Sequence, residues 1–192
     1  MAQAKPLKWS TATVPCTYCQ KPTELQTGAE LYNRPDLGGK HFWVCKPCGA
    51  WVGTRHDGEP LGTLANATTR IARREAHKVF DALWDTTRRW WPEGTTPGMA
   101  APPFSTRWAA YAWLSKQLGL EADRTHIAMF DEGQCAAVVA LAADAMKALT
   151  ATKRKADAAV KRDAKKAAKE DDARRAEVAL RVKLDELQDL MK

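Results

Sequence analysis

Apolar and polar positions follow two different periods along the chain, and each period predicts its own kind of element. Short apolar runs at residues 41–44 and 50–52 predict two strands, and proline and glycine at residues 33–39 predict a turn. After Asn66, which can cap a helix, Ile71, Val79, Phe80, Leu83 and Trp84 fall largely on one helical stripe. This helix is predicted to end before Trp91, and the prolines of residues 93–103 predict a loop.

A second helix follows the loop. Ser105 can cap it, the apolar residues Trp108, Ala112 and Leu118 are expected to face inward, and Gly119 is expected to end it.

The third helix opens on a capping box formed by Asp131 and Gln134. Its first part is apolar on a broad face, so that part is expected to pack in a core. No proline or glycine follows Ala151. One long helix is therefore predicted from about Glu132 to near the end of the chain, where it extends beyond the globular part as an arm.

Four of the five cysteines form two C-x-x-C pairs with 25 residues between them: Cys16 with Cys19, and Cys45 with Cys48. A C-x-x-C turn directs both sulfurs at one point, and two such turns complete a tetrahedron around Zn²⁺. This spacing favours zinc over four unrelated thiols and over a redox pair, which needs only one such motif. Because four cysteines leave no open position on the metal, the sequence predicts one structural zinc ion. The fifth cysteine, Cys135, is interpreted as a small buried apolar residue.

The zinc is expected to contribute to folding as well. About fifty residues bury too little surface to fold comfortably alone. Metal binding supplies on the order of 10–16 kcal/mol in small zinc modules. Chelation is therefore expected to unfold at least residues 9–58.

Composition and charge narrow the class of protein. The net charge is +7, and it is concentrated at residues 147–169, which hold nine basic and two acidic side chains. No apolar run approaches the roughly 20 residues that span a bilayer, and the first residues lack the apolar core of a signal peptide. We expect a cytoplasmic protein with no membrane partner, in the host cytoplasm if a phage encodes it.

Two surfaces are candidates for binding nucleic acid. Basic side chains on the arm can neutralise phosphates, and aromatic and basic residues beside the zinc can stack bases and hold phosphates. The alternatives are a solvated helix face and a ribbon core. The candidate residues are Lys153, Arg154, Lys155, Lys161, Arg162, Lys165, Lys166 and Lys169 on the arm, with Trp43 and Lys46 on the ribbon.

A further stripe of basic residues lies on the first helix, opposite its apolar stripe, and is interpreted as a solvated face that can extend a basic surface. It consists of Arg70, Arg73, Arg74, His77 and Lys78. His77 and Asp81, four residues apart, are neighbours, but a catalytic pair needs a third group and a pocket. The sequence supplies neither, so it predicts no enzyme.

The end of the arm has an apolar seam with 4-3-4 spacing: Leu180, Leu184, Leu187 and Met191. The seam covers fewer heptads than a convincing coiled coil. It is a candidate for contact with a partner protein, with a second copy of the chain, or with the protein's own body.

The residues also resemble a known family. Cys16-x-x-Cys19, the run from Trp43 to Gly53, and the run from Pro60 to Asn66 resemble a zinc-finger-containing domain of unknown function that is widespread in bacteriophages and prophages. The resemblance extends through the helices to Val139. It departs from the family at Ala128, where glycine is usual, in the proline-rich insertion, and in the C-terminal arm. It implies a zinc ribbon joined to helices, and a viral origin.

Together these features predict an α+β, mainly α protein: a small four-cysteine zinc ribbon packed on a helical domain and followed by a long basic helix. The predicted segments are a tail (residues 1–8), the ribbon (9–58), a helical domain (59–150) and the arm (151–192). The leading hypothesis is a non-enzymatic protein that binds nucleic acid or a nucleoprotein complex. The alternative is an adaptor or inhibitor of a host enzyme such as RNA polymerase, acting through the ribbon and the seam.

Overall fold

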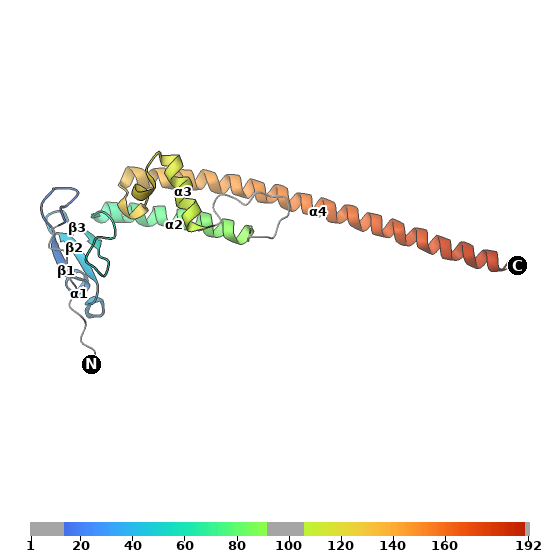
Figure 1. Ribbon diagram of the computed structural model, residues 1–192, viewed down its shortest axis with the longest axis horizontal. Helices are drawn as coiled ribbons and strands as arrows, with labels where there is room; N and C mark the ends of the chain where they lie inside the picture. The colour runs from blue at the N-terminus through green and yellow to red at the C-terminus, as the bar shows by residue number, and fades with distance from the viewer. Residues whose placement is uncertain (1–13, 92–105, 191–192) are drawn as a thin grey trace. The chain divides into compact units, whose positions relative to one another are not determined.

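The computed structural model describes residues 14–91 and 106–190, and it confirms an α+β, mainly α fold. Two compact units make up the chain, Met1–Ala145 and Met146–Lys192. The ribbon and the helices that follow it belong to the first unit (Figure 1). The division falls inside the last helix, five residues before the boundary predicted at residue 150.

The ribbon is a three-stranded antiparallel sheet in the order β1 (Glu24–Thr27), β2 (His41–Cys45) and β3 (Ala50–Gly53). The predicted strands correspond to β2 and β3, whereas β1 was not predicted. Between β1 and β2 lie a short helix, α1 (Gly28–Tyr32), and the 3₁₀ turn η1 (Pro35–Leu37). Thr27 and Glu30 form a capping box that starts α1, so the connection is a helical turn with a loop at residues 33–39.

Helix α2 (Ala67–Trp90) begins at the predicted cap, where Asn66 Oδ1 accepts a hydrogen bond from the Thr69 amide at 2.9 Å. Its fully buried apolar side chains are Ala76, Phe80 and Leu83. Ile71, which the sequence placed on the same apolar stripe as Phe80 and Leu83, is 53% exposed.

Helix α3 (Arg107–Leu118) is capped by Thr106, while Ser105 lies outside the described residues. Gly119 ends the helix in the left-handed conformation, as predicted. Its buried residues are Ala110 and Leu114. The inward position predicted for Trp108 is wrong, since this ring is 82% exposed. The buried residues therefore lie two positions after the predicted ones: Ala110 is buried instead of Trp108, and Leu114 instead of Ala112.

Two short 3₁₀ turns, η2 (Ala122–Arg124) and η3 (Ile127–Met129), lead to the long helix α4 (Glu132–Leu190). The predicted capping box is present: the Gln134 amide donates to Asp131 Oδ1 at 2.7 Å, and the Asp131 amide donates to Gln134 Oε1 at 3.1 Å. Cys135 is buried, as predicted.

In the second unit α4 is a single uninterrupted helix. Hydroxyls in the middle of a helix can compete with its backbone hydrogen bonds, but Thr150 and Thr152 donate back to the carbonyls four residues earlier and the helix continues. By length and composition α4 also meets the criteria for a helix that crosses a membrane, which the core helices of soluble proteins meet as well. The expectation of no membrane partner stays a prediction.

Candidate metal centre

The two C-x-x-C pairs lie next to each other at one end of the sheet, where Cys45 is the last residue of β2 and Cys48 lies in the turn that leads to β3. One sulfur from each of Cys16, Cys19, Cys45 and Cys48 lies within 4.8 Å of all the others. The Cys19 and Cys45 sulfurs are 3.6 Å apart. Four sulfurs at about 2.3 Å from one zinc ion lie about 3.8 Å from each other, so the cluster has the dimensions of a tetrahedral site.

Each pair sits on a tight backbone turn that aims its sulfurs. The residue after each second cysteine, Gln20 in one pair and Gly49 in the other, has a φ of 58°. Glycine adopts this left-handed conformation without cost, and a residue with a side chain does so with some strain. In the first turn the Tyr18 amide points at the Cys16 sulfur, 3.4 Å away. A backbone amide of the first turn is therefore directed at one of the turn's own sulfurs.

The protonation of the thiols depends on their proximity. A backbone hydrogen bond from Lys21 lowers the pKa of the Cys19 thiol to about 7. The Cys19 sulfur in turn raises the pKa of Cys48 to about 12, and burial raises that of Cys45. Like charges this close cannot all form without a cation. The cluster thus requires a metal ion if all four cysteines are to be thiolates, as zinc ligation demands.

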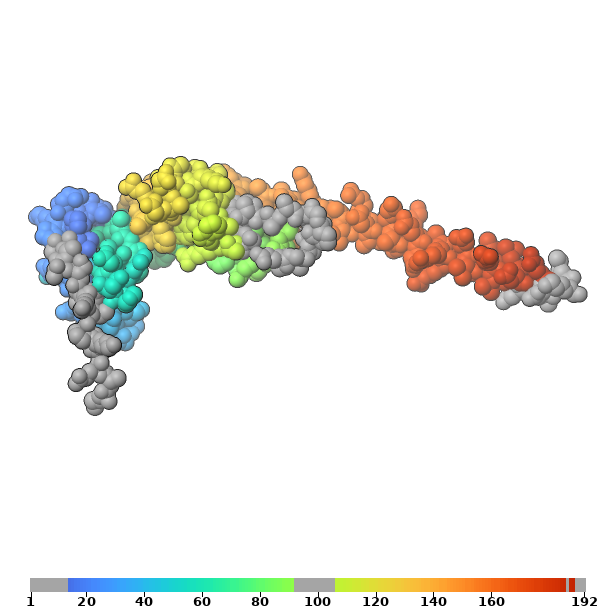
Figure 2. All heavy atoms as spheres, in the orientation of Figure 1, coloured from blue at the N-terminus to red at the C-terminus, as the bar shows by residue number. Residues whose placement is uncertain are grey.

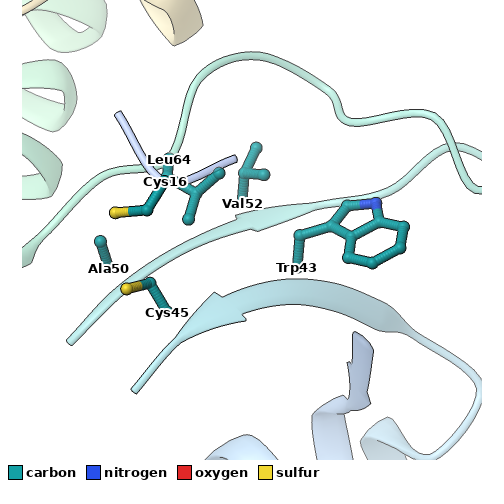
Figure 3. Close-up of a cluster of buried hydrophobic side chains, with 6 residues drawn as sticks. All are labelled: Cys16, Trp43, Cys45, Ala50, Val52 and Leu64. Atoms are coloured by element: carbon teal, nitrogen blue, oxygen red, sulfur yellow. The ribbon is translucent and has the colours of Figure 1, made fainter. Parts of the chain in front are cut away.

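Two of the ligands belong to the ribbon's small apolar core, which Cys16 and Cys45 share with Trp43, Ala50, Val52 and Leu64. Figure 3 shows the two cysteines at one end of this cluster and the Trp43 ring at the other. Trp43 is only 8% exposed, and its indole N–H donates to the Gly58 carbonyl at 2.9 Å. This burial removes Trp43 from the surface that was predicted to contact nucleic acid.

A chain of hydrogen bonds joins the first C-x-x-C turn to the helices. The Asn66 amide donates to the Tyr18 phenolic oxygen at 3.1 Å, and this oxygen lies 2.6 Å from Thr69 Oγ1. The Thr69 hydroxyl is buried and donates to Glu132 Oε1 at 2.5 Å. Residues of the zinc turn, of α2 and of α4 therefore meet in one polar network, which sequence reasoning missed because its members are far apart in the chain.

Two arginines of the predicted basic stripe on α2 have structural contacts. Arg73 donates to the carbonyls of Phe130 and Thr63, both at 2.8 Å, and to Thr63 Oγ1 at 2.6 Å. Arg70 donates to the Ala65 carbonyl at 2.6 Å and lies 4.5 Å above the centre of the Trp51 ring. The interpretation of the whole stripe as a solvated face is wrong for these two residues. His77 bonds the Arg73 carbonyl instead of Asp81.

Among the remaining predicted binding residues that the structure describes, Lys153 is partly exposed and the others are exposed. Lys46 pairs with Glu24 at 2.6 Å, with both side chains more than half exposed. On the arm, Lys153 pairs with Asp157, and Lys166 lies 3.8 Å from Glu170. In the seam, Leu180, Leu184 and Leu187 are 61%, 52% and 58% exposed, and Met191 lies outside the described residues.

The donor set of four cysteines, their spacing and the paired turns fit one structural Zn²⁺. The family model of a zinc-finger-containing domain matches residues 12–145. No curated protein and no solved structure matches the chain. The family match covers both C-x-x-C pairs and the helices down to the first turns of α4, and on this basis the chain belongs to the family of zinc-finger-containing domains.

Proposed function

We propose that this protein binds nucleic acid without catalysing a reaction, in the cytoplasm, with the zinc ribbon and its helices as a rigid scaffold. The observation that carries the proposal is the charge of residues 147–169, a stretch of one helix that holds nine basic and two acidic side chains. The helix leaves residues 161–169 exposed, and Figure 2 draws the side chains of this segment in orange at the surface.

Electrostatics explains why this segment suits nucleic acid. Each phosphate that a lysine or arginine neutralises releases condensed counterions, which gives affinity that falls steeply with salt. Surface ion pairs such as Lys166 with Glu170 are worth little, so they do not prevent a basic side chain from exchanging its partner for a phosphate. A closed four-cysteine site supports a binding role too, because no coordination position is open for a substrate.

The test is fluorescence anisotropy of a labelled oligonucleotide with the full chain across a salt series. Replacing Lys161, Arg162, Lys165 and Lys166 by glutamine should weaken binding and reduce the slope of log affinity against log salt. The matched control replaces four basic residues in residues 170–192, which hold five basic and seven acidic side chains: Arg174, Arg175, Arg181 and Lys183. If neither set changes binding, or the wild-type chain does not bind at low salt, the proposal is wrong.

The exposed seam favours a second candidate function, contact with a protein. Leu180, Leu184 and Leu187 follow coiled-coil spacing and are more than half exposed. A nuclease-treated pull-down that retains a partner for the wild type and loses it for Leu184→Glu would favour the adaptor. Sedimentation of the same two proteins shows whether the partner is a second copy of the chain. That the protein acts in a phage-infected cell stays a prediction from the resemblance.

A further inference from the structure

Two hollows lie beside each other on the ribbon and have Gly53 and Leu61 in both linings. One, of about 550 Å³, is lined by residues around the ends of β2 and β3, and the other, of about 370 Å³, by residues of β3 and α2. We call them the basic double hollow. Among the described residues no aspartate or glutamate belongs to either lining. The basic lining residues are Lys40, His41, Arg55, His56, Arg70, Arg73, Arg74 and His77.

Arg70 and Arg73 are held in place by neutral groups. Backbone carbonyls, the Thr63 hydroxyl and the Trp51 ring accept their contacts, at the distances given above. Within the described part of the chain, neither guanidinium forms an ion pair. The Arg70 charge is therefore positioned in advance and not neutralised, and an anion that enters the hollow gains from it without the cost of ordering a flexible side chain. Arg73 is positioned as well, but it also lines a second pocket together with Asp131 and Glu132, whose charges offset part of its own.

Arg74 adds a charge that is free to move. Its side chain is 73% exposed and lies 3.9 Å from Glu75, a contact between exposed groups that contributes little. It can therefore turn toward a ligand in the hollow.

Each hollow also contains an aromatic ring, Phe42 in the larger and Trp51 in the smaller. The two rings contact each other edge to face, with centroids 5.4 Å apart, so the apolar surface continues from one hollow to the other. Cationic groups beside aromatic rings in a concave surface suit a single nucleic-acid strand, whose phosphates and unpaired bases are both within reach. A base in a duplex is paired and stacked, and does not offer its face to such a surface.

We propose that the basic double hollow binds the phosphates and bases of a single-stranded nucleic acid. The proposal rests on the proposed function, and it assigns to the ribbon a site separate from the basic helix. Sequence reasoning pointed to the basic stripe on α2, but the ribbon residues that it named, Trp43 and Lys46, lie outside both linings.

The experiment places a negative charge at that junction. Leu61→Glu changes a side chain that is 54% exposed and common to both linings. Ile71→Glu is the matched control: it makes the same kind of change on α2 at 53% exposure, outside both linings. Anisotropy of the full chain with a labelled 20-nucleotide DNA strand, and with the matching duplex, measures the effect. Thermal unfolding shows whether both variants remain folded.

Leu61→Glu should weaken binding of the single strand at low salt about fivefold to tenfold through charge repulsion, and binding of the duplex less than twofold. Ile71→Glu should bind both as the wild type does. A second pair of variants covers the case in which Leu61→Glu fails to fold. Arg74→Gln should reduce the salt slope for the single strand by about 0.7 per lost phosphate contact, and Lys78→Gln, exposed on α2 outside the linings, should not.

Other results separate the two proposals. In one such result, the wild type binds, the four-glutamine variant of the basic helix does not bind, and Leu61→Glu binds as Ile71→Glu does. The proposed function then stands, and the proposal for the basic double hollow is wrong. If the duplex is affected as strongly as the single strand, or polyglutamate displaces the strand at equal charge concentration, the ligand class is wrong. If the wild type binds neither oligonucleotide, both proposals fail.

Discussion

The phenolic oxygen of Tyr18 lies 2.6 Å from the hydroxyl oxygen of Thr69, and this contact joins the zinc turn to the first turn of α2. Tyr18 stands between two zinc ligands in the sequence, while Thr69 is buried and bonded to Glu132 at the start of α4. Since the zinc ligands flank Tyr18, the zinc site also positions a hydrogen bond to the first turn of α2. The ribbon is thus coupled to the helical part of the first unit.

Tyr18→Phe removes the hydroxyl from this network and keeps the ring. The Asn66 amide loses an acceptor, and the buried Thr69 hydroxyl loses a partner. We expect the free energy of unfolding to fall by about 1 kcal/mol with one zinc still bound per chain. Chemical denaturation and a zinc assay measure the two quantities. An unchanged stability would show that the contact does not couple the ribbon to the helices.

The same network makes stability depend on pH. The hydrogen bond from Thr69 lowers the pKa of the Glu132 carboxyl below its ordinary value of 4.5. A carboxyl whose pKa is lower in the folded state stabilises the fold above the unfolded pKa, and loses that contribution as the pH falls through the folded one. The stability difference between the wild type and Glu132→Gln should therefore be largest near neutral pH and shrink below 4.5. Acid also affects the zinc site, but it does so in both proteins, so the difference between their denaturation curves over this pH range reports on Glu132 alone. A difference in stability that stays constant with pH would contradict the prediction.

Arg73 should resist replacement by lysine. Its planar guanidinium makes three hydrogen bonds to Phe130 and Thr63, and an ammonium group cannot reproduce that fork. Arg73→Lys should cost about 1–3 kcal/mol of stability. Arg74→Lys, one position along and exposed, should change stability little. Thermal unfolding of the two variants decides, and equal melting temperatures would mean that the three bonds contribute nothing.

Gly49 is expected to be required for its backbone conformation rather than for space. A Cβ added there meets nothing within 4 Å, but φ is +58°. Gly49→Ala should therefore cost about 1–2 kcal/mol, through backbone strain alone. Gly39→Ala also meets nothing within 4 Å and has no such φ, so it should be close to neutral. A Gly49→Ala protein as stable as the wild type would mean that this turn adapts without strain.

The zinc ligands, the caps at Asn66 and Asp131 and the full extent of α4 could be predicted because each is a local pattern of residue types at fixed spacing. Strand β1 could not, since Glu24–Thr27 has no apolar alternation. The capping box at Thr27 and Glu30 is a local signal that was available and overlooked.

The errors concern tertiary contacts, which no local pattern carries. Trp43 and Trp51 are both aromatic strand residues, yet Trp43 packs in the core beside the zinc ligands and Trp51 lies on the opposite face of the sheet. Only the register of the strands decides which face each ring occupies. Trp108 and Ile71 look like core residues by their chemistry, but the neighbouring elements pack elsewhere. The role of Arg73 depends on a carbonyl 57 residues away.

The central claim is a closed zinc site made of four thiolates, and X-ray absorption at the zinc edge tests it most directly. On the purified protein, this measurement should find four sulfur neighbours at about 2.3 Å from the zinc, and elemental analysis of the same sample should find one zinc ion per chain. Cys135→Ser should give the same spectrum, because Cys135 is buried outside the cluster. A nitrogen or oxygen neighbour in the first coordination shell, or a folded protein that contains no zinc, would contradict the account.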